Sequence, residues 1–137
     1  MTKAEPAIVA VRRLENQEMR DALAEELGKR TRVWIDEGAT IFVTGSIARG
    51  EATEHSDLDA FLVTTGPALD EATRRRFRQD LAAAAEAADA PRPELRDDRR
   101  YEHTLEELVA KMGTDAEDVE NQLTTRLLLL LESRPLV

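Results

Sequence analysis

Two short apolar segments, residues 40–44 and 58–65, lie on either side of a small, polar stretch of chain. Both segments are rich in β-branched and aromatic residues and are too short for a typical helix, so each predicts a buried strand. Gly45 and Ser46 follow the first segment and allow the chain to turn, and the polar run after them predicts a turn or a short helix. The pattern therefore constrains the chain to a small sheet in which two strands are joined through this polar stretch.

Helical patterns surround the two strands. They are expected over residues 14–36, 68–89, 105–112 and 115–132, after a partly ordered lead-in at 1–13. Proline suits the first turn of a helix, so Pro67 is expected near the start of the second helix. Thr104 and Thr114 are each followed three residues later by glutamate, a capping pattern that predicts the starts of the last two helices. The expected fold is α/β or α+β, a small mixed sheet flanked by a long N-terminal helix and C-terminal helices, in a single domain over residues 1–137.

An Asp-x-Asp pair opens the second predicted strand. Side chains two apart on a strand share a face, so Asp57 and Asp59 should point the same way and Leu58 the other way. Two carboxylates this close stay ionised only with a cation between them. Oxygen ligands in a chain without cysteine favour Mg²⁺ or Mn²⁺. Gly45 and Ser46 offer a turn, a hydroxyl and a backbone N–H suited to phosphate, so the stretch predicts phosphoryl or nucleotidyl transfer.

Gly45-Ser46 followed by Asp57-Leu58-Asp59 between apolar strands resembles the signature of the DNA polymerase beta-like nucleotidyltransferase superfamily, in its bacterial minimal-domain type. The likeness covers residues 40–64. The resemblance implies that the Gly-Ser pair holds the triphosphate of an NTP, expected to be ATP. It also implies that the aspartate pair is catalytic and binds two divalent metal ions. The reaction implied is Mg²⁺-dependent transfer of an NMP from an NTP to a hydroxyl of a protein or small molecule.

Superfamily enzymes usually carry a third carboxylate on a later strand, where it helps to bind metal and deprotonates the acceptor hydroxyl. Glu94, Asp97 and Asp98 lie in the corresponding segment, and their spacing does not choose between them. Two prolines at the start of this segment argue against a central strand, so residues 94–101 are expected to be a short edge strand or an extended loop. Arg49 is expected to steady a phosphate. The alternative function is a non-catalytic nucleotide-binding or antitoxin-like regulatory module, which the absence of a third carboxylate near the pair would favour.

Five consecutive leucines occupy positions 127–131. Successive helical residues are about 100° apart, so this run covers every face of a helix and leaves apolar surface for a partner. We expect residues 123–131 to contact a second copy of the chain or another protein, or to pack on a further part of a longer protein. The segment 118–135 also resembles part of larger bacterial proteins of the superfamily.

The net charge of −9 would repel a phosphate backbone, so generic nucleic-acid binding is not expected. The absence of cysteine excludes disulfides, thiolate zinc sites and cysteine nucleophiles. The leucine run is much shorter than the roughly 20 residues of a membrane-spanning helix. The first residues lack the apolar core of a secretory signal. A cytoplasmic protein without membrane contact is therefore expected.

Overall fold

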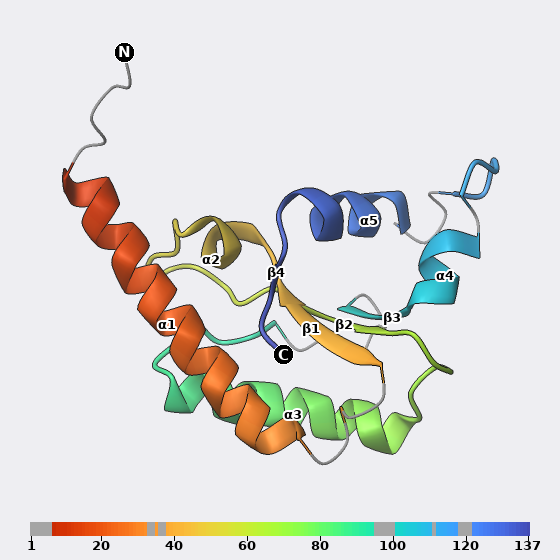
Figure 1. Ribbon diagram of the computed structural model, residues 1–137, viewed down its shortest axis with the longest axis horizontal. Coiled ribbons are helices and arrows are strands. Elements are labelled where there is room, and N and C mark those ends of the chain that lie inside the picture. The colour runs from red at the N-terminus through yellow and green to blue at the C-terminus, as the bar shows by residue number, and fades with distance from the viewer. Residues whose placement is uncertain (1–6, 33–34, 36–37, 95–100, 111, 118–121) are drawn as a thin grey trace.

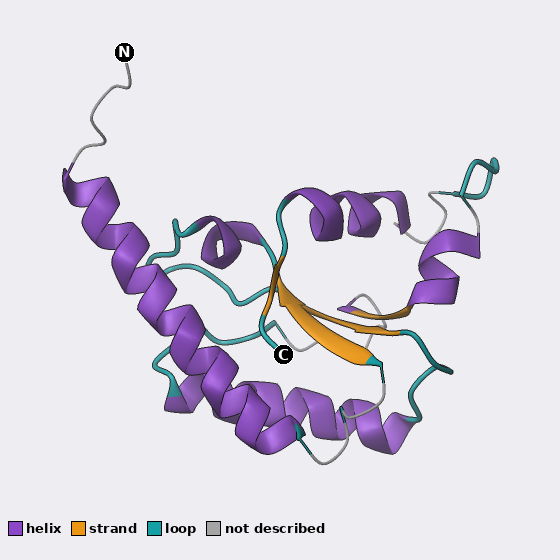
Figure 2. Cartoon of the chain, in the orientation of Figure 1, coloured by secondary structure: helices purple, strands orange, loops and turns teal. Residues whose placement is uncertain are grey.

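The computed structural model describes residues 7–32, 35, 38–94, 101–110, 112–117 and 122–137. Its elements in chain order are α1 (Ala7–Thr31), β1 (Ala39–Val43), α2 (Gly45–Arg49), β2 (Ala60–Thr64), α3 (Glu71–Ala87), β3 (Glu102–Thr104), α4 (Leu105–Ala110), α5 (Gln122–Leu131) and β4 (Arg134–Pro135). Figure 1 follows the chain through these elements, and Figure 2 separates helices, strands and loops by colour. The mixed α/β architecture expected from the sequence is confirmed.

The four strands form one mixed sheet in the order β3-β2-β1-β4. β1 and β2 are antiparallel, with Ile41 opposite Leu62 and Val43 opposite Ala60. β3 runs parallel to β2, and β4 pairs antiparallel with β1 on the other side. Because β1 and β2 run in opposite directions, the end of β1 lies beside the start of β2. The turn that follows β1 and the residues that precede β2 therefore lie side by side at one end of the two central strands.

The hydrophobic core lies between the sheet and the helix pair α1 and α3. These two helices cover the lower face of the sheet in Figure 1, while α5 lies over the opposite face. The core side chains are Leu23, Leu27, Ile41, Val43, Ile47, Ala48, Leu58, Ala60, Leu62, Phe77, Leu81, Ala84 and Ala85. Burial of one leucine side chain stabilises the fold by about 1.5–3 kcal/mol. Because this core includes Val43 at the end of β1 and Ala60 at the start of β2, it holds these two strand ends in place. None of the described helices combines the length and the apolar character needed to cross a membrane.

α1 starts earlier than the sequence pattern predicted. It begins at Ala7, so the expectation of a partly ordered lead-in over residues 1–13 was wrong from Ala7 onward. No glycine or proline interrupts the sequence between Ala7 and Gly28, so no helix-breaking residue separates the first turns from the rest of α1. The expected helix end at Asp36 and the expected core residue Trp34 lie outside the described residues.

α3 starts later than predicted, and Pro67 is not in its first turn. The helix begins at Glu71, after Asp70 as the N-cap residue. The Asp70 side chain accepts a hydrogen bond from the backbone N–H of Thr73 at 2.7 Å. This cap satisfies one of the free N–H groups of the first turn, so the helix starts where the capping side chain stands rather than at the proline.

Of the two predicted capping boxes, the first is confirmed and the second is wrong. Thr104 and Glu107 exchange side-chain-to-backbone hydrogen bonds of 2.9 and 3.0 Å at the start of α4. Thr114 does not begin a helix, because the described residues that follow it form turns. The Glu117 carboxylate accepts a hydrogen bond from the backbone N–H of Gly113 at 3.1 Å, within this turn.

α5 buries two polar residues and leaves most of its leucines exposed to solvent. Gln122 and Thr125 are its buried residues. The exposed leucines are Leu123, Leu127, Leu130 and Leu131, at 40%, 47%, 80% and 72% exposure. These positions recur at helical spacing and form one face, which we call the leucine stripe. The expectation that the leucine run leaves apolar surface exposed is confirmed.

Candidate functional site

The Gly-Ser pair stands where β1 passes into α2. The backbone N–H of Thr44 donates to the carbonyl of Asp59 at 3.0 Å, which extends the β1–β2 pairing to the residue directly before Gly45. Gly45 has a φ of +65°, a left-handed conformation that costs a residue with a Cβ about 1–2 kcal/mol. A Cβ at Gly45 would lie 3.2 Å from Oδ2 of Asp59. The turn therefore lies directly against the Asp59 side chain, and glycine permits that close approach.

α1 holds the connection between the turn and the aspartates in place. Arg20 donates to the carbonyl of Ala48 in α2 at 2.9 Å. Asn16, almost fully buried, binds both backbone groups of Ala52, accepting from its N–H at 3.0 Å and donating to its carbonyl at 3.2 Å. α1 therefore anchors the part of the connection that follows the Gly-Ser pair, from Ala48 to Ala52.

Asp57 and Asp59 stand just before β2. The residues that alternate with them, Leu58 and Ala60, are 1% and 4% exposed and belong to the core. Asp57 is exposed and Asp59 is half-buried. The alternation of buried apolar residues with accessible acidic ones is the pattern that the sequence predicted for this stretch.

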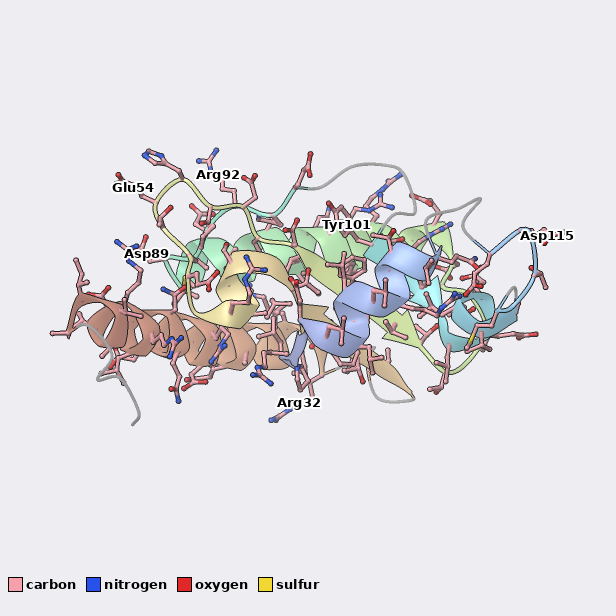
Figure 3. All side chains as sticks on the ribbon, turned by 90° about the horizontal axis from the view of Figure 1, so that it is seen from above. Arg32, Glu54, Asp89, Arg92, Tyr101 and Asp115 are labelled. Carbon is pink, nitrogen blue, oxygen red and sulfur yellow. The ribbon has the colours of Figure 1, made fainter. Side chains whose placement is uncertain are left out.

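Glu94 comes beside Asp59 through a parallel bridge. Leu58 pairs with Pro93, and the N–H of Leu58 donates to the carbonyl of Arg92 at 3.1 Å. In this register Glu94 follows the bridge on one segment as Asp59 follows it on the other, so the two acidic side chains are neighbours. In Figure 3, the loop carrying Glu54 and the segment carrying Arg92 lie on the same side of the molecule.

Among the three candidates for a third carboxylate, Glu94 is the one that the structure brings next to the aspartate pair. Asp97 and Asp98 lie outside the described residues. The prediction that prolines prevent a central strand agrees with the pairing seen here, which is an isolated bridge at Pro93 rather than a strand. β3 begins only at Glu102, after the segment that had been expected to form an edge strand or a loop.

Negative charge accumulates around Asp59. Partial burial raises the pKa of Asp59 above its ordinary value, and the charges of Asp57 and Glu94 raise the pKa further. A hydrogen bond from Tyr101 lowers it. Within the described residues, no group of three histidine or acidic side chains is arranged to hold a metal ion. The carboxylates around Asp59 nevertheless repel one another, and a divalent cation bound to the aspartate pair would relieve that repulsion.

Tyr101 is a residue of the site that sequence reasoning missed. Its hydroxyl donates to Oε2 of Glu94 at 3.4 Å. Its ring meets Phe61 edge-on, with the ring centroids 5.2 Å apart at 67°. The His103 ring stacks on Phe61 at 6.2 Å. No local motif marks Tyr101, because it reaches the site only through the pairing of β3 with β2.

Arg49, expected to steady a phosphate, forms two ion pairs. Its Nε lies 2.8 Å from a carboxylate oxygen of Glu51, and an η-nitrogen lies 2.7 Å from Glu132. The hydrogen bond to Glu51 raises the pKa of the guanidinium, and the charges of Glu51 and Glu132 add to the effect. These contacts tie α2 to the residue that follows α5, and the phosphate contact of Arg49 stays a prediction.

Comparisons with known proteins bear on this arrangement. Neither the curated proteins nor the solved structures gave a match. A family model described as a nucleotidyltransferase domain matches residues 12–111. The match covers most of the chain and includes the Gly-Ser pair, the aspartate pair and Glu94. The chain therefore belongs to the nucleotidyltransferase domain family of the polymerase beta-like superfamily, as its motif implied.

Proposed function

We propose that this chain is a Mg²⁺-dependent nucleotidyltransferase that moves an NMP from an NTP, with ATP as the expected nucleotide, onto a hydroxyl of a protein or small molecule. Nucleotidyl transfer in general follows from the family. The position of Glu94 beside Asp59 carries the proposal of catalysis, because it supplies the third carboxylate that the aspartate pair lacked in the sequence.

The donor set suits Mg²⁺ or Mn²⁺. Asp57, Asp59 and Glu94 offer only oxygen ligands, which these hard cations prefer. The raised pKa of Asp59 reflects partial burial and the negative charges of Asp57 and Glu94. When bound, divalent ions would neutralise charge on the triphosphate and lower the pKa of the acceptor hydroxyl.

The chain's own residues divide the remaining work. The Gly45 turn lets backbone and the Ser46 hydroxyl approach the leaving phosphates, which accept hydrogen bonds there. The acceptor oxygen bonds to the α-phosphorus, and the bond from that phosphorus to the pyrophosphate oxygen breaks. A carboxylate oxygen of Glu94 takes the proton of the acceptor hydroxyl. Positioning and charge neutralisation suffice for this displacement, so no covalent enzyme intermediate is required.

The alternative, a non-catalytic nucleotide-binding or antitoxin-like regulatory module, makes the same ligand contacts without the transfer step. The neighbouring Glu94 supports the catalytic function over this alternative.

The exposed leucine stripe of α5 supports a protein contact in addition to nucleotide binding. We therefore propose that residues 123–131 bind a second copy of the chain, with a different protein as the other occupant to be tested.

Calorimetry with a non-hydrolysable ATP analogue tests the binding step. We expect the wild-type protein to bind the analogue with Mg²⁺ and not with a chelator, and the double variant Asp57→Asn/Asp59→Asn to lose this binding while staying folded. The matched control, Glu86→Gln/Asp115→Asn, removes two charges from exposed positions elsewhere and should bind normally. Binding that survives in the site variant contradicts the proposal.

Pyrophosphate release tests the transfer step without knowledge of the acceptor, because water can replace the acceptor hydroxyl at a low rate. We expect slow Mg²⁺-dependent release from ATP, and its loss in Glu94→Gln. Tight Mg²⁺–ATP binding with no release under any condition would favour the regulatory alternative.

A further inference from the structure

We propose that Tyr101 is a positioning residue whose hydroxyl holds the carboxylates of Asp59 and Glu94 in place for a divalent cation. The proposal rests on the proposed function, since it concerns the same carboxylate cluster. It assigns a role to the one aromatic hydroxyl that the structure places beside this cluster within the described residues.

The ring of Tyr101 is fixed by the sheet. Tyr101 directly precedes β3, and the pairing of Leu62 with Glu102 places it beside Phe61 in the same register. Phe61 is 3% exposed and meets the Tyr101 ring edge-on at 5.2 Å. Phe61 also lies two residues after Asp59 on the same segment, so both side chains are on one face. The aromatic contact therefore sets where the hydroxyl stands relative to Asp59.

The hydroxyl stands between two groups that repel each other. It donates to Oε2 of Glu94 at 3.4 Å, and its proximity to Asp59 lowers the pKa of that carboxyl. Tyrosine has one O–H proton, so it can donate to only one of these carboxylates at a time. Sharing that donor limits the rotation of both side chains and offsets part of their repulsion. Hydrogen-bond partners of this kind orient metal ligands, and their loss typically weakens metal affinity about 10–100-fold.

The ring and the hydroxyl have separable roles. Tyr101→Phe keeps the edge-on contact with Phe61 and removes only the oxygen. Tyr101→Leu removes the ring contact as well, so it should lower the thermal unfolding midpoint where Tyr101→Phe does not. A residue that served packing alone would tolerate phenylalanine without any change at the site. In Figure 3, Tyr101 lies on the same side of the molecule as Arg92, whose segment leads into Glu94.

Mn²⁺ affinity measured by electron paramagnetic resonance, with a non-hydrolysable ATP analogue present, tests the proposal. We expect Tyr101→Phe to bind Mn²⁺ about 10-fold more weakly than wild type, with an unchanged unfolding midpoint. In a Glu94→Gln background, we expect the same substitution to have a much smaller effect, because the shared hydrogen bond is already altered. Glu86→Gln, at an exposed position of α3, is the control for loss of one acidic charge.

A second readout uses the fact that Tyr101 is the only tyrosine of the chain. With tyrosine labelled by carbon-13 at Cζ, the protein gives a single NMR signal that reports the environment of the phenol oxygen. We expect this signal to move when Mg²⁺ and the ATP analogue are added, and to move in Glu94→Gln but not in Glu86→Gln.

The outcomes separate the two proposals. If wild type binds Mn²⁺ with the analogue and Tyr101→Phe binds it equally well, the positioning role is overturned and the proposed function stands. A Tyr101 NMR signal whose chemical shift is the same in Glu94→Gln as in wild type overturns the positioning role as well. If wild type binds no Mn²⁺ with the analogue, the proposed function fails, and the role of Tyr101 fails with it.

Discussion

Gly45→Ala adds one methyl group at the point where the Gly-Ser turn meets Asp59. The φ of +65° at this position should cost alanine about 1–2 kcal/mol of folding free energy. The new Cβ would stand 3.2 Å from Oδ2 of Asp59, a tighter contact than most Cβ atoms make, so the carboxylate must move by a few tenths of an ångström. Asp59 is a proposed metal ligand, and disturbing the groups that orient a metal ligand typically weakens metal affinity about 10–100-fold, so we expect Mg²⁺-dependent NTP binding to weaken about tenfold. Gly45→Val should bind more weakly still.

Gly113→Ala separates backbone strain from the contact with Asp59. Gly113 has a φ of +74°, so alanine there carries a similar strain, but its Cβ would meet nothing within 4 Å. Urea denaturation should show comparable losses of stability in Gly45→Ala and Gly113→Ala. Calorimetry with Mg²⁺ and the ATP analogue should show weakened binding only in Gly45→Ala. Equal nucleotide affinity in the two variants would refute the reasoning that the close approach to Asp59 matters for binding.

Three further predictions concern other parts of the site and its surroundings. Ser46→Ala should weaken calorimetric Mg²⁺–NTP binding by about 1–2 kcal/mol, the usual loss for a hydrogen bond to a charged group, and unchanged affinity would remove Ser46 from the phosphate contact. Because the pKa of Asp59 is raised in the metal-free folded state, the stability linked to its protonation is lost as pH rises through that pKa. Urea denaturation of Asp59→Asn should therefore show a stability gain over wild type that grows as pH rises above about 4, whereas parallel pH profiles would contradict this linkage. Leu127→Glu/Leu130→Glu should abolish the self-association expected in light scattering and leave NTP binding intact, and a wild-type protein that is monomeric at every concentration would disprove the second-copy contact.

The sheet centre and the motif could be predicted because their signals are local. The apolar runs that became β1 and β2, the glycine at the turn and the alternation of Asp57 and Asp59 with core residues all follow from neighbouring positions in the chain. The capping box at Thr104 is equally local and is confirmed. Physical preferences that act within a few residues need no knowledge of the rest of the fold.

The rest of the site depends on contacts between distant segments. Glu94 is brought to Asp59 by the bridge between Leu58 and Pro93, and Tyr101 by the pairing of β3 with β2. The spacing of residues in the sequence does not reveal either pairing. The sequence therefore could not choose Glu94 over Asp97 and Asp98, and it gave no sign of Tyr101. The two-residue strand β4 likewise has no pattern of its own and exists through its pairing with β1.

The most direct test of the account is a crystal structure with Mn²⁺ and a non-hydrolysable ATP analogue, in which anomalous scattering locates the metal. The account predicts Mn²⁺ at the carboxylates of Asp57 and Asp59, with Glu94 at the same cluster and the triphosphate on the Gly45–Ser46 turn. Metal and triphosphate bound away from these residues, with the aspartate pair left without a cation, would contradict it.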